Sequence, residues 1–60
     1  MEWLELKQIM DSWPLLMSQT TDPWALKFTA DIWELAVSPK WRPTLKQAQV
    51  MRQLHREIEN

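Results

Sequence analysis

Residues 22–37, DPWALKFTADIWELAV, decide the fold, because they predict one long helix that is apolar around most of its circumference. Asp22 is a favourable N-cap, and Pro23 suits the first helical position, where its missing N–H does no harm. The apolar residues form two stripes: Ala25, Phe28, Ile32 and Leu35 on one, and Leu26, Ala30, Trp33 and Val37 on the other. A helix of this kind is usually buried on several sides, so we expect Trp24 to about Val37 to be the central element.

An amphipathic helix is also predicted on either side of this segment. Before it, Trp3, Leu6 and Met10 recur at helical spacing over residues 2–12, and Trp13 continues the same face. Pro14 ends or kinks that helix and can open a short extra turn through residues 15–17.

After residue 37, Thr44 and Gln47 form a capping box, which predicts a helix from Leu45 to about Glu57 with Ala48, Met51, Leu54 and Ile58 buried. The sequence therefore predicts one small all-α domain over residues 1–60, with a helical hairpin and an N-terminal helix in a three-helix arrangement.

Tryptophan is the unusual component, with five residues in a chain of 60 (Trp3, Trp13, Trp24, Trp33 and Trp41). A chain this short buries only about 60% of its unfolded surface, and no cysteine is present to form a disulfide. A core of this size holds about three indole rings. We therefore expect Trp3 and Trp41 to be at least partly exposed, and we expect a homodimer or a partner protein to add stability.

Composition argues against an enzyme. The chain has no glycine for a phosphate-binding loop, no cysteine and a single histidine, His55. His55 and Glu59 stand four residues apart, but two ligands do not complete a metal site. We expect no catalytic residue, metal, cofactor or small-molecule substrate. An acidic N-terminus and short apolar runs predict a cytoplasmic protein without a membrane partner, and Met1 suggests a complete chain.

Charge is unevenly distributed along the chain, although the net charge is only −1. Residues 1–37 carry six acidic and two basic residues, which gives −4, and residues 38–60 carry five basic and two acidic residues, which gives +3. The basic residues of the second part, which could contact DNA phosphates, are Lys40, Arg42, Lys46, Arg52 and Arg56. The opposing interpretation is a solvated helix face whose cations pair with Glu34, Glu57 or Glu59.

The stretch WRPTLKQAQVMR, residues 41–52, resembles a recurring helical element of phage and phage-like replication proteins. In that element a Ser/Thr and a Lys-Gln pair open a short helix, often after a helix that contains tryptophan. The resemblance covers residues 24–58 and implies a small phage or mobile-element protein near DNA transactions. It implies no enzymatic role.

Two functions follow as expectations. The first is a non-catalytic protein-interaction adaptor or inhibitor, in which Trp3, Trp13 and Trp41 anchor the contact while Leu6 and Met10 fill a groove. The alternative is an accessory protein that contacts DNA through the basic third helix.

Overall fold

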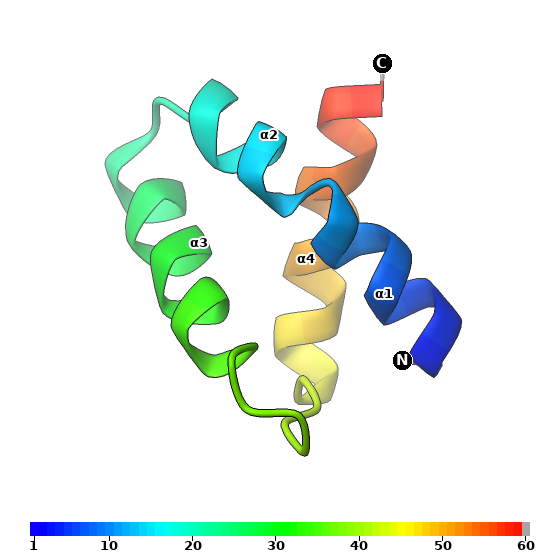
Figure 1. Cartoon of the computed structure of the whole chain (residues 1–60). Coiled ribbons are helices and arrows are strands. Elements are labelled where there is room, and N and C mark those ends of the chain that lie inside the picture. The colour runs from blue at the N-terminus through cyan, green and yellow to red at the C-terminus, as the bar shows by residue number, and fades with distance from the viewer. Residues whose placement is uncertain (60) are drawn as a thin grey trace.

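The computed structural model describes residues 1–59, which form four α-helices. They are α1 (Trp3–Asp11), α2 (Trp13–Gln19), α3 (Pro23–Leu35) and α4 (Leu45–Glu59). Figure 1 shows α3 on one side of the molecule, α1 on the other, and α4 between them, while α2 crosses one end. The all-α prediction is confirmed, and the described residues contain no strand.

The N-terminal part forms two helices, where the sequence predicted one helix followed by a short turn. The break falls at Ser12, because Pro14 has no N–H with which to reach the carbonyl of Met10. The Ser12 N–H instead bonds to the Ile9 carbonyl at 3.1 Å, and the Ser12 carbonyl accepts from the Leu16 N–H at 3.0 Å. The proline thus divides one amphipathic pattern into α1 and a complete helix α2.

Helix α2 lies close to each of the other three helices, so the prediction that residues 24–37 form the central element is wrong. Within the described part of the chain, the backbone of α2 approaches those of α1, α3 and α4, whereas the backbone of α3 closely approaches only that of α2. The buried face of α3 consists of Ala25, Thr29 and Ile32. Its second apolar stripe, predicted to be buried as well, is exposed at Leu26, Trp33 and Val37.

The core is built around Trp13, which is 0% exposed at the start of α2. Leu6 and Ile9 of α1, Leu16 of α2, Ile32 of α3 and Met51 of α4 complete the buried cluster. Trp13 is the one fully buried tryptophan of the described residues, since Trp3, Trp24 and Trp33 are exposed and Trp41 is half-buried. The expectation of three buried indole rings was therefore too high.

Both predicted N-caps, Asp22 and the Thr44–Gln47 capping box, are confirmed by hydrogen bonds in the structure. The Asp22 carboxylate accepts a hydrogen bond from the Ala25 N–H at 3.0 Å. At the start of α4, the Thr44 hydroxyl accepts from the Gln47 N–H at 3.1 Å, while the Gln47 side chain accepts from the Thr44 N–H at 2.9 Å. These caps satisfy N–H groups that the first turn of a helix leaves unpaired.

None of the helices in the described residues is both long and apolar enough to cross a membrane.

Candidate protein-docking site

An apolar hollow of about 430 Å³ lies between α1, the end of α3 and the segment that joins α3 to α4. Three tryptophans from these three parts of the chain line it: Trp3, Trp33 and Trp41. Leu6 and Met10 of α1 and Ala36, Val37 and Pro39 after α3 add further apolar surface. We call this feature the tryptophan hollow.

The connection after α3 brings Trp41 into the hollow. Helix α3 ends in successive turns in which the Val37 N–H bonds to Glu34 and the Ser38 N–H bonds to Leu35. The Trp41 N–H then bonds back to the Ser38 carbonyl at 3.2 Å, so the chain reverses before α4 begins. Trp41 packs against the core cluster as a half-buried ring.

Arg42 lines the hollow and contacts Trp3 of α1. Its guanidinium carbon lies 5.1 Å from the centre of the Trp3 ring, which is within the range of a cation–π contact. The same guanidinium donates to the Trp41 carbonyl at 2.8 Å. Arg42 therefore joins the connecting segment to α1, and its charge lies beside an exposed aromatic ring.

Most of the predicted protein-contact residues converge on this hollow. Trp3, which is 58% exposed, lies at its edge, whereas Met10 and Trp41 are half-buried in its wall. Leu6 is nearly buried and contributes to the floor.

Trp13 is misplaced in the predicted set, because it lies in the core and cannot reach a partner in this fold. Trp33 takes its place at the hollow with 43% of its surface exposed. The sequence carried a signal for it, since Trp33 stands on the second stripe of an all-round apolar helix, but that stripe was interpreted as buried.

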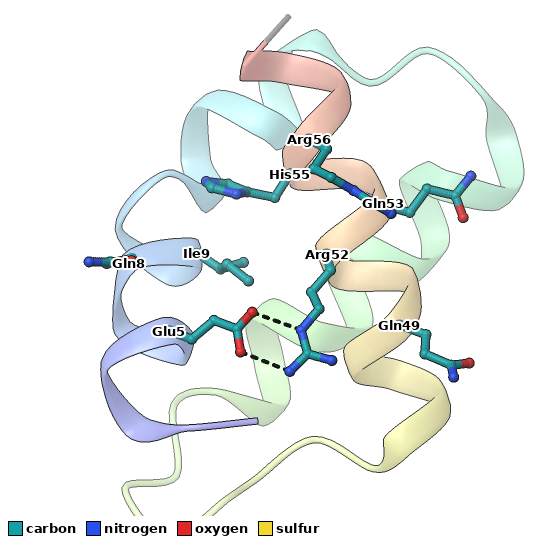
Figure 2. A pocket seen from close by; sticks show the side chains of 8 residues that line it. All are labelled: Glu5, Gln8, Ile9, Gln49, Arg52, Gln53, His55 and Arg56. Carbon is teal, nitrogen blue, oxygen red and sulfur yellow. Dashed lines mark hydrogen bonds and ion pairs between the residues drawn. The ribbon is translucent and has the colours of Figure 1, made fainter.

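The predicted basic set is divided between different environments. Arg52 donates two hydrogen bonds to Glu5 of α1, from Nε to Oε2 at 2.7 Å and from Nη2 to Oε1 at 2.8 Å (Figure 2). These bonds lower the pKa of Glu5 and raise the pKa of Arg52. The predicted carboxylate partners were Glu34, Glu57 and Glu59, so the contact with α1 was missed.

The other basic residues, Lys40, Arg42, Lys46 and Arg56, are exposed. Arg56 shares a second hollow, of about 490 Å³ between α1 and α4, with Arg52, His55 and several glutamines. In Figure 2, Gln49 and Gln53 extend from α4 away from α1. The exposed face of α4 is therefore polar and basic.

No group of three His, Cys, Asp or Glu side chains that could hold a metal ion occurs among the described residues. The side chain of Glu59, the predicted companion of His55, lies outside the described part of the structure.

Comparison of the chain with protein-family models, curated proteins and solved structures finds no match.

Proposed function

We propose that this chain is a non-catalytic binding protein that docks a protein partner in the tryptophan hollow. The observation that carries the proposal is the convergence of Trp3, Trp33 and Trp41 on one apolar hollow at the surface. Contact with another protein gives this exposed apolar surface the burial that the chain's own core does not provide.

The residue types at the hollow support a protein partner. Tryptophan and arginine are enriched among the residues that contribute most to binding energy, and both occur here as Trp33 and Arg42. Large apolar patches that remain exposed on small proteins commonly mark interaction sites. By its resemblance over residues 24–58, we place the protein among phage or mobile-element adaptors and inhibitors.

Site-specific photo-cross-linking tests this proposal. A photoreactive aromatic residue is introduced at Val37, which lines the hollow and is 78% exposed, or at Leu45, which lies outside it and is 76% exposed. We expect a discrete cross-linked protein from position 37 and none from position 45.

Matched tryptophan variants control for general adhesion. Trp33→Ala removes a wall of the hollow, whereas Trp24→Ala removes an exposed ring of α3 that lies elsewhere. The product from position 37 should disappear with the first variant and persist with the second. Equal products from positions 37 and 45, or equal loss with both alanine variants, would contradict the proposal.

DNA contact is the second candidate function, and one feature of α4 favours it. Lys46, Gln49, Gln53 and Arg56 recur at helical spacing and are all exposed. Lysine and arginine can neutralise phosphates, and glutamine can read the edge of adenine in the major groove.

Charge reversal on α4 tests this second function. Arg52 is a poor choice for the substitution, because its loss also leaves Glu5 without its partner. Lys46→Glu with Arg56→Glu should reduce duplex affinity and lower the salt slope by about 2, as expected for two lost phosphate contacts. Lys7→Glu with Lys27→Glu makes the same charge change on α1 and α3. Equal effects of the two double variants, or no binding at low salt, would rule out this face.

A further inference from the structure

The docking proposal does not identify the partner, and the exposed side of α3 supplies an argument for one. Leu26, Ala30 and Trp33 of α3 and Val37, which lies two residues after the end of α3, are all exposed and follow one another at intervals of 4, 3 and 4 residues. This spacing is that of the apolar seam by which two helices pack in a coiled coil. We call these four residues the α3 row.

From these observations we infer that a second copy of this chain docks along the α3 row, with the two α3 helices antiparallel. The inference rests on the proposed function, because Trp33 and Val37 belong to both the row and the tryptophan hollow. The row therefore extends the same docking surface along the helix.

The row is available for this contact because α3 uses a different face for its own fold. Ala25, Thr29 and Ile32 are buried towards the core, and among the described helices the backbone of α3 closely approaches only that of α2. Each row residue within α3 directly follows a buried residue in the sequence, as Leu26 follows Ala25. One residue corresponds to about 100° around the helix. The row thus lies to one side of the intramolecular contact.

Charge complementarity sets the direction of the two helices. Lys27 and Glu34 flank the row on the side away from the core and carry opposite charges, and the exposed Lys27 also pairs with Asp31 of its own helix at 3.6 Å. In an antiparallel pair centred between residues 30 and 31, Lys27 of each copy lies at the level of Glu34 of the other. The two-fold symmetry then forms this attraction twice. A parallel pair has no equivalent opposition of charges.

Side-chain size fits the same arrangement. Ala30 lies near the two-fold axis, where its small side chain lets the two helices approach closely. Trp33 of each copy then lies over the region between Leu26 and Ala30 of the other, so that a large ring meets a small residue. Interdigitation of this kind is what close packing of two helices requires.

A stable dimer requires a contact area that extends beyond the four residues of the row. A stable interface buries about 800 Å² per partner, which is roughly a fifth of the 4467 Å² surface of this chain. Helix α3 has 13 residues and is about 20 Å long. The hollow beside it adds the exposed ring of Trp3, which extends the apolar surface from α3 to α1.

Sedimentation equilibrium of the full chain over a range of concentrations tests the inference. The wild-type protein should approach twice its chain mass of 7.3 kDa as concentration rises. Leu26→Glu should weaken the dimer by at least about tenfold, because it places a charge twice in an apolar interface. Leu15→Glu is the matched control, since Leu15 is similarly exposed (54% against 44% for Leu26) on α2, and it should leave the dimer unchanged.

A charge exchange tests the antiparallel direction. Lys27→Glu and Glu34→Lys should each weaken association by about fivefold, because each turns both intermolecular attractions into repulsions between like charges. The double variant should restore the wild-type dissociation constant. Circular dichroism of each variant separates loss of association from loss of folding.

Two results would overturn the inference: a wild-type chain that remains monomeric at every concentration, or equal weakening by Leu26→Glu and Leu15→Glu. If the double charge variant associates no better than the single variants, the antiparallel arrangement is wrong. A monomeric chain that still gives a Trp33-dependent cross-link from position 37 to another protein rejects the second copy alone and leaves the docking function standing. A chain that neither dimerises nor gives a Trp33-dependent cross-link from position 37 rejects both proposals.

Discussion

The indole Nε1 of Trp13 donates a hydrogen bond to the backbone carbonyl of Thr29 at 3.0 Å, and both residues are buried. This bond joins the first turn of α2 to the middle of α3. The Thr29 hydroxyl in turn donates to the Leu26 carbonyl one turn earlier in α3, at 3.0 Å. Trp13 thus provides both the largest ring of the core and a polar link between α2 and α3.

Substitution of Trp13 should be the most damaging single change in the chain. Trp13→Phe retains an aromatic ring but loses the bond to Thr29, so we expect a loss of about 1–2 kcal/mol in the free energy of unfolding. Trp13→Ala also leaves a cavity and should cost about 3–5 kcal/mol, enough to unfold a protein of this size. Urea denaturation measures both values, with Trp24→Phe as the exposed control. Similar losses for Trp13→Phe and Trp24→Phe would contradict the structural role of this bond.

The Asp22 cap gives a second measurable contribution. Asp22→Ala leaves the Ala25 N–H without its acceptor and should lower the free energy of unfolding by about 1 kcal/mol. Asp22→Asn retains an oxygen acceptor and should recover most of this loss. Thermal denaturation followed by circular dichroism distinguishes the two variants. If they are equally destabilised, charge at the helix terminus rather than the hydrogen bond accounts for the effect.

The helix starts could be predicted because their signals are local. Asp22 with Pro23 and Thr44 with Gln47 each act within one turn, and the structure contains the expected bonds. Pro14 was identified as a break for the same reason. Hydrophobic periodicity does not predict which apolar side of a helix packs against another helix.

Long-range contacts explain the errors at the candidate site. Trp13 and Trp33 both stand at apolar positions of predicted helices, yet one is in the core and the other at the surface. The difference depends on which sides of the helices meet: Trp13 begins α2, which lies close to the other three helices, whereas Trp33 lies on the exposed side of α3. The Glu5–Arg52 pair joins residues 47 positions apart and has no signature in either local pattern.

Filling the tryptophan hollow should block docking without reducing the apolar character of the surface. Ala36 is half-buried in the lining, so Ala36→Phe places a ring inside the cavity. We expect the cross-link from position 37 to disappear, because a partner side chain can no longer enter. Ser18→Phe adds the same ring to an exposed position of α2 and should leave the cross-link intact. A product that persists with Ala36→Phe would show that the partner binds elsewhere on this face.

The Glu5–Arg52 pair predicts a specific dependence of stability on pH. Hydrogen bonding from Arg52 lowers the pKa of Glu5 from its ordinary value of 4.5, so the folded state favours the ionised carboxylate. The stability contributed by this pair is therefore present above pH 4.5 and is lost as pH falls through the lowered pKa. Glu5→Gln should destabilise the protein at pH 7 and have little effect once wild-type Glu5 is protonated.

A double-mutant cycle isolates this contribution from other acid effects. Glu5→Gln, Arg52→Gln and the double variant are compared with wild type by urea denaturation at pH 7 and at a lower pH at which wild-type Glu5 is shown to be protonated. The coupling between positions 5 and 52 should be favourable at pH 7 and should shrink at the lower pH, since a neutral carboxyl group attracts the guanidinium less strongly. The same coupling at both pH values would mean that the contact between α1 and α4 does not depend on the charge of Glu5.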